Sequence, residues 1–108
     1  MQCILTALKA ESDPLIASFN LVRSSSFNFP VFVNGTQELY LIGLGVGKSK
    51  VEYRIKKFID KINEPLMQFI NIGVAGSNPS FSEIGEIFLI NKITDEQFGH
   101  FYYPDILI

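Results

Sequence analysis

The sequence predicts an α/β fold with a mostly parallel central sheet, a β-hairpin and flanking helices. Short apolar runs typical of buried strands alternate along the chain with two helical patterns. The segments 37–43, 48–62 and 66–72 read as strand, helix and strand, which predicts a right-handed crossover between parallel strands. The dipeptide Asn34-Gly35 separates two further strand-like runs, as in a hairpin.

The composition bounds the function classes. A chain of 108 residues with 47% hydrophobic residues forms one domain, 1–108, with a real core. A net charge of −2 gives no general attraction to nucleic acid, and the apolar run 39–47 is too short to span a membrane. The single cysteine, Cys3, excludes a disulfide framework within one chain and a cysteine-based metal site. With no signal peptide visible, we expect a cytoplasmic protein without metal or cofactor.

The first half of the chain alternates strands and turns. Residues 2–8 are a buried strand, and a helix follows with Ser12 or Asp13 as its N-cap, Pro14 at its first position and its end near residue 20.

A polar loop at 23–28 then leads to the hairpin strands 29–33 and 37–43. Both Asn34 and Gly35 tolerate the positive φ that a tight turn needs.

The segment 48–62 has the clearest helical pattern, and Asn63-Glu64-Pro65 ends it. Its apolar residues form one stripe, namely Val51, Ile55, Phe58, Ile59 and Ile62. Six of the nine basic residues fall between 48 and 61, which suits either a nucleic-acid surface or a solvated helix face. Glu52 and Asp60 interrupt this run and favour the solvated face, so no nucleic-acid partner is expected.

Buried strands are also expected at 66–72 and 86–93. The loops after residues 8, 43 and 72 then leave the carboxyl ends of parallel strands, where ligands bind in open α/β sheets. The loop GLGVGKSK departs from the triphosphate-loop pattern, because Ile42 occupies the position of the first Walker glycine. It is not a dinucleotide loop either, because the third glycine is replaced by Lys48.

Four segments in register, TALKAE (6–11), GLGVGKSK (43–50), INIGVAGS (70–77) and IGEI (84–87), carry a resemblance. Together they resemble the nucleoside phosphorylase superfamily, and most closely its 5′-methylthioadenosine/S-adenosylhomocysteine nucleosidase branch. The resemblance spans nearly the whole chain and implies the N-terminal portion of that fold. It also implies a purine nucleoside as ligand and cleavage of its N-glycosidic bond. A homo-oligomer is expected separately, because exposed strand edges and apolar surface favour dimerisation.

The resemblance assigns roles residue by residue. Glu11 occupies the place of the glutamate that activates the attacking water. Substrate-binding positions correspond to Leu8 at the ribose, Val46 near the 5′ substituent, and Val74, Ala75 and Gly76 against the ribose and base. Without an arginine in the first loop, hydrolysis is favoured over phosphorolysis.

Departures from the pattern concern the substrate and the missing groups. Thr6, Val74 and Ser77 differ from the residues usual in the branch. The ribose-binding glutamate and the aspartate that protonates the purine would both lie beyond residue 108, so we expect the chain alone to be inactive. Asp95 and Asp105 are expected to be turn or surface residues, and the lone His100 is expected to be exposed or hydrogen-bonded.

Two other function classes stay open. A non-catalytic module would bind a ligand or dimerise through exposed sheet edges. A nucleotide binder would be stabilised by ATP with magnesium.

Overall fold

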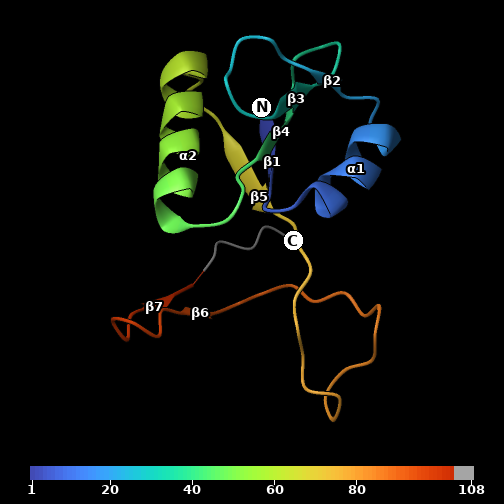
Figure 1. Ribbon diagram of the computed structural model, residues 1–108, viewed down its shortest axis with the longest axis vertical. Coiled ribbons are helices and arrows are strands. Elements are labelled where there is room, and N and C mark those ends of the chain that lie inside the picture. The colour runs from blue at the N-terminus through green and yellow to red at the C-terminus, as the bar shows by residue number, and fades with distance from the viewer. Residues whose placement is uncertain (104–108) are drawn as a thin grey trace. The chain divides into compact units, whose positions relative to one another are not determined.

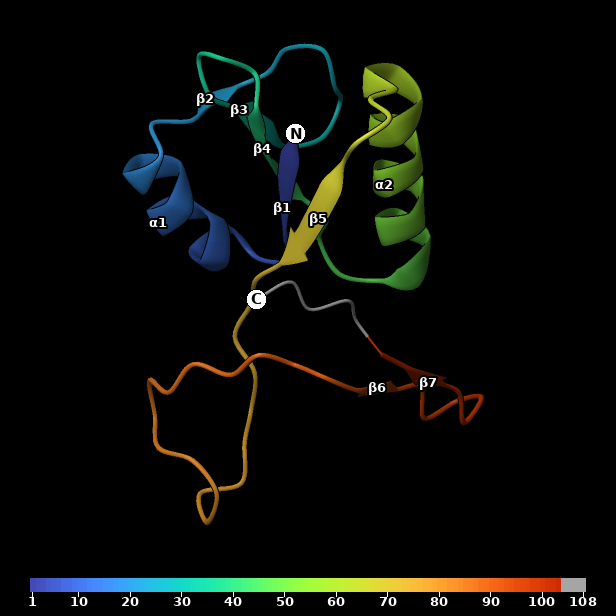
Figure 2. The same ribbon diagram turned by 180° about the vertical axis from the view of Figure 1, so that it is seen from behind.

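The computed structural model describes residues 1–103, which fall into two compact units, Met1–Ala75 and a second that begins at Gly76. The first unit is an α/β layer structure, with α1 and α2 on opposite faces of one sheet (Figures 1 and 2). Its elements are β1 (Gln2–Thr6), α1 (Lys9–Ser18), β2 (Val22–Arg23), β3 (Val31–Val33), β4 (Leu39–Gly43), α2 (Lys48–Ile62) and β5 (Gln68–Asn71). No helix in the described range is long and apolar enough to cross a bilayer.

The predicted α/β class is confirmed, and the sheet is mixed. Its strand order is β2-β3-β4-β1-β5. The central strand β1 pairs in parallel with both β4 and β5, whereas β3 pairs antiparallel with β4 and with β2. The β3–β4 hairpin is therefore confirmed. The short strand β2 falls partly in the predicted loop 23–28, so that part of the prediction is wrong.

Alternating side chains build a core on each face of the sheet. Cys3, Tyr40 and Ile42 pack with Phe58 of α2 on one face, and Ile4 and Leu41 form a smaller cluster on the other. The Cys3 thiol is fully buried, and this desolvation raises its pKa to about 11, so the thiol stays neutral at physiological pH.

The helix α1 begins earlier than predicted. It starts at Lys9, so neither Ser12 nor Asp13 is the N-cap, and Pro14 lies inside the helix. The Glu11 carboxylate accepts the N–H of Leu8, which caps the helix from within. The buried Ser12 hydroxyl lies 2.6 Å from the hydroxyl of Thr6, so this residue fastens α1 to β1 instead of capping it.

The hairpin turn also differs from the prediction. Positive φ occurs at Gln37 (58°) and not at Asn34 or Gly35. The Asn34 side-chain oxygen accepts the backbone N–H of Glu38 at 3.0 Å and of Leu39 at 3.2 Å. This side chain closes a wider turn, so the tight two-residue geometry is not needed.

The predicted helix 48–62 is confirmed as α2. Its stripe packs on the sheet with Phe58 fully buried, while Ile59 remains 40% exposed. Gly47 precedes the helix with φ of 107°, and Asn63 ends it in the left-handed region while its N–H bonds the carbonyl of Ile59.

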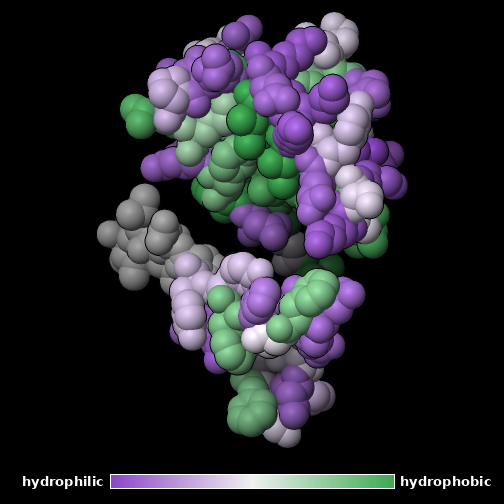
Figure 3. All heavy atoms as spheres, turned by 90° about the vertical axis from the view of Figure 1, so that its left-hand side faces the viewer, coloured by the Kyte–Doolittle hydropathy of each residue, from purple (hydrophilic) through white to green (hydrophobic). Residues whose placement is uncertain are grey.

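Two strand predictions are wrong in part. Residues 66–72 contain β5, but this strand is exposed instead of buried, because it lies at the end of the sheet order. Residues 86–93 do not form a strand. Only Ile93–Thr94 (β6) pairs with Phe101–Tyr102 (β7), since a strand needs a partner ladder and not just apolar side chains. Many large hydrophobic side chains are therefore exposed to solvent, and Figure 3 shows hydrophobic side chains between hydrophilic ones on one face of the molecule.

Candidate functional site

Three loops leave the same edge of the sheet, as the sequence predicted. Because β1, β4 and β5 are parallel, the segments that follow Thr6, Gly43 and Asn71 all start at the carboxyl edge. Thr6 is paired with Gly43 in the register, and Leu5 is paired with Asn71. This edge is therefore the place where side chains from distant parts of the chain meet.

Glu11 joins two of these loops. Its Oε1 accepts the backbone N–H groups of Ala7 at 3.0 Å and Leu8 at 2.9 Å, both in the loop after β1. Its Oε2 accepts the N–H of Val74 at 2.8 Å, in the loop after β5. A side chain on Gly73 would force the carboxylate to shift, because a Cβ there would lie 2.9 Å from Oε2.

The hydrogen bonds of Glu11 also set its charge. The N–H of Val74 contributes most to lowering the pKa of the carboxyl group, followed by that of Leu8, with a smaller contribution from Ala7. Partial desolvation acts in the opposite direction and is outweighed by the three bonds together. Glu11 is therefore ionised at neutral pH, which strengthens its three hydrogen bonds.

A cavity of about 300 Å³ lies beside this carboxylate. Among the described residues, Glu11 is the only acidic one in its lining, which otherwise consists of Ala7, Asn71, Ile72, Gly73 and Val74. The cavity thus offers one anion and one amide side chain, Asn71, among apolar and backbone groups. Such a lining suits a largely uncharged ligand with hydroxyl groups.

The structure brings together some of the residues that the sequence selected. Glu11 and Val74 are in direct contact, whereas the exposed side chains of Leu8, Val46 and Ala75 are not in the lining of this cavity. Gly76 belongs to the second unit, and a Cβ built there would meet nothing within 4 Å.

Sequence reasoning missed four lining residues, Ala7, Asn71, Ile72 and Gly73. Asn71 and Gly73 stand in the INIG segment, where a polar residue at a strand end and a glycine directly after it were available signals. Ala7 contributes a backbone N–H, and its type carries no signal of that role.

The glycine loop before α2 is a strand-to-helix turn. Gly45 and Gly47 both have positive φ, 72° and 107°, and Lys48 is the exposed first residue of the helix. Within residues 1–103, no cluster of three or more His, Cys, Asp or Glu side chains is arranged to hold a metal ion.

The second unit holds the remaining candidates. His100 is exposed, and its ring centroid lies 6.2 Å from that of Phe98 and 6.5 Å from that of Tyr102. Asp95 is a turn residue, since its Oδ1 accepts the N–H of Gln97 at 3.0 Å. Asp105 lies outside the described residues.

Comparison of the chain with protein-family models, with curated proteins and with solved structures found no match. The likeness to the nucleoside phosphorylase superfamily therefore rests on the four sequence segments. The geometry at the carboxyl edge stands independently of that likeness.

Proposed function

We propose that this chain provides the first part of a nucleosidase-type site, which cleaves the N-glycosidic bond of a purine nucleoside. The observation that carries the proposal is the ionised Glu11 carboxylate, held between the loops after β1 and β5 beside the cavity of about 300 Å³. A base of this kind next to a mostly apolar wall is what such a hydrolysis requires.

In the proposed reaction, Glu11 uses the hydrogen-bond acceptor position that the backbone N–H groups leave free. A carboxylate has about four acceptor positions, and three are occupied by backbone N–H groups, which leaves one for a water molecule. In the reaction, the bond from C1′ to the purine nitrogen breaks and its electron pair stays on the base. The water oxygen bonds to C1′, and its proton passes to Glu11.

The surrounding residues have supporting roles in this proposal. Ile72 and Val74 provide the apolar wall, and Asn71 offers an amide to a sugar hydroxyl. Leu8 and Val46 lie on loops of the same edge and would close on the ribose and the 5′ substituent. Among the described residues, this cavity has no second carboxylate to protonate the leaving purine, so we expect binding without turnover by this chain alone.

Calorimetric titration with methylthioadenosine tests the proposal. The 108-residue chain is expected to bind it, and Glu11→Gln is expected to weaken binding by about tenfold or more, since a charged acceptor is lost. Glu52→Gln, on the exposed side of α2, is the matched control and should leave the affinity unchanged.

Two outcomes of that titration count against the proposal. One is the absence of binding by the wild-type chain, and the other is equal affinity of wild type and Glu11→Gln. Release of adenine by the isolated chain, abolished by Glu11→Gln, would contradict the expected inactivity and place the leaving-group acid within these residues.

A second candidate function, assembly of copies of this chain, is favoured by the outer edge of β5. This edge strand has no proline or charged residue, and its Phe69 and Ile70 are 40% and 44% exposed. The opposite edge, β2, is only two residues long and includes Arg23. Native proteins protect sheet edges by such shortening and charges, so of the two edges in the described sheet β5 is the one better suited to strand pairing.

Sedimentation of variants tests this candidate. Wild type is expected to dimerise at high concentration, and Ile70→Lys should shift it towards monomer, because a charge on the edge opposes pairing. Val22→Lys, on the protected edge, is the control and should not change the distribution. A wild-type chain that remains monomeric throughout the concentration series would eliminate this candidate.

A further inference from the structure

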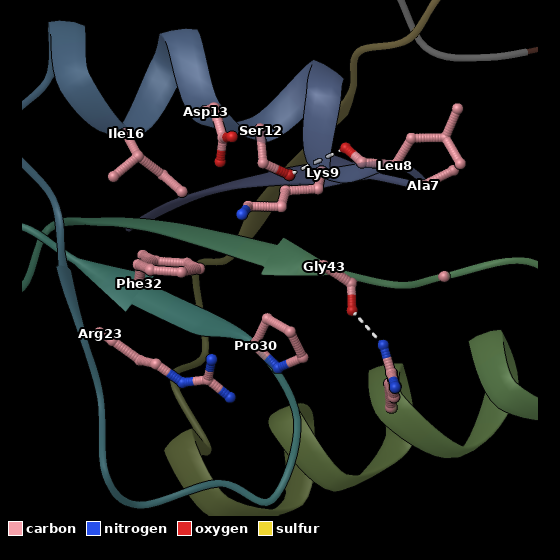
Figure 4. Close-up of a pocket in the computed structure, with 12 residues that line it drawn as sticks. Ala7, Leu8, Lys9, Ser12, Asp13, Ile16, Arg23, Pro30, Phe32 and Gly43 are labelled. Atoms are coloured by element: carbon pink, nitrogen blue, oxygen red, sulfur yellow. Dashed lines mark hydrogen bonds between the residues drawn. The ribbon is translucent and has the colours of Figure 1, made fainter.

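A second cavity, with a volume of about 210 Å³, is lined by residues of α1, of the strands and of α2. In Figure 4, α1 lies on one side of it and the strands β3 and β4 on the other. Ile16 comes from α1, Phe32 comes from β3, and Pro30 comes from the segment before β3. These three side chains form the apolar walls of the cavity. In the part of the chain that the structure describes, Ala7 is the only lining residue that it shares with the Glu11 cavity.

Cationic side chains from three different elements line this cavity. Lys9 is the first residue of α1, Arg23 belongs to β2, and Arg54 belongs to α2. Figure 4 shows Lys9 extending between α1 and the strands, with Arg23 below Phe32. Within residues 1–103, Asp13 is the one acidic residue in the lining, so three positive groups stand against one negative group. This excess favours an anion.

Arg54 is already held in position. Its Nη1 donates to the carbonyl oxygen of Gly43 at 2.7 Å, and its Cζ lies 5.6 Å from the centre of the Phe29 ring. The hydrogen bond uses one of the five N–H donors of the guanidinium, so other donors remain for a ligand. An arginine fixed in this way loses little side-chain entropy when it binds an anion.

We propose that this cavity binds a small organic anion, in which a carboxylate or phosphate group is attached to an apolar ring or chain. The cationic residues bind the charged group, and the apolar body packs against Ile16, Pro30 and Phe32. The Glu11 cavity does not suit such a ligand, because the Glu11 carboxylate would repel it. The site therefore differs from the proposed nucleoside site in both place and ligand charge.

Binding of four small probes to the 108-residue chain tests this site, measured by calorimetry at one fixed ionic strength. Phenyl phosphate and benzoate share the ring and differ in the charged group, whereas benzyl alcohol lacks the charge and inorganic phosphate lacks the ring. At least one of the two aromatic anions is expected to bind about tenfold or more tightly than both benzyl alcohol and inorganic phosphate. The preferred one identifies the charged group.

Charge-removing variants locate the site. Arg23→Gln and Lys9→Gln, both at exposed positions, are each expected to weaken binding of the preferred anion by about tenfold. Lys56→Gln removes the same charge from the exposed side of α2, away from the cavity lining, and should leave the affinity for the anion unchanged. The proposal is overturned if inorganic phosphate binds as tightly as phenyl phosphate, or if neither aromatic anion binds. It is also overturned if Arg23→Gln, Lys9→Gln and the control Lys56→Gln all bind the preferred anion with the same affinity.

Discussion

Replacing Phe58 with alanine is expected to lower the free energy of unfolding by about 3–5 kcal/mol. The Phe58 side chain is fully buried between α2 and the sheet. Its ring centroid lies 5.6 Å from that of Phe27 and 5.3 Å from that of Tyr40. Alanine would leave a cavity and remove both aromatic contacts, and urea unfolding followed by circular dichroism measures the loss.

Lys56→Ala provides the comparison on the same helix. This residue is exposed, so its replacement should change the free energy of unfolding by no more than about 0.5 kcal/mol. If Phe58→Ala costs no more than Lys56→Ala, then α2 does not pack on the sheet as described.

The contribution of Glu11 to stability is expected to disappear in acid. Its pKa is lowered in the folded chain, so ionised Glu11 stabilises the fold above its unfolded pKa, near the reference value of 4.5. As the pH falls through the lower, folded pKa, the carboxyl group is protonated in both states and this contribution is lost. The three backbone N–H groups then lose their charged acceptor.

The difference in stability between wild type and Glu11→Gln measures this effect. We expect wild type to be the more stable at pH 7, and the difference to shrink as the pH falls below about 4.5, because protonated Glu11 resembles glutamine. Glu52→Gln serves as the control for removing a negative charge. A difference that stays constant from pH 7 to pH 2 would mean that the N–H groups do not bind the ionised carboxylate.

The sequence predicted α2 correctly because all its signals are local. The apolar stripe defines the buried face, and the Asn63-Glu64-Pro65 segment ends the helix, with Asn63 adopting the left-handed conformation that stops it. The parallel orientation of β4 and β5 also followed from local patterns, because a helix between two predicted strands implies a crossover.

The failures occur where a distant side chain or a missing partner decides the structure. Pro14 and Ser12 suggested a later start for α1, but Glu11 binds the N–H groups that precede the helix. Residues 86–93 have the composition of a strand, yet composition does not provide a partner with free N–H and C=O groups.

The candidate site was likewise predicted from the sequence only in part. The sequence placed Glu11 and the loop with Val74 at one edge, and the structure brings them to hydrogen-bonding distance. The role of Gly73 was not predicted, because close approach of a carboxylate to a glycine requires coordinates. The cavity of Lys9 and Arg23 was also missed, since nothing in the sequence brings these two residues to one cavity.

The amide NMR spectrum of the chain, recorded with and without methylthioadenosine, tests most directly whether the nucleoside occupies the Glu11 cavity. The amide signals of Ala7, Gly73 and Val74 are expected to shift on addition of the ligand. Those of Val33 and Asn34, at the opposite edge of the sheet, should stay in place. Shifts at Val33 and Asn34 with none at Gly73 or Val74 would contradict a nucleoside site at the carboxyl edge.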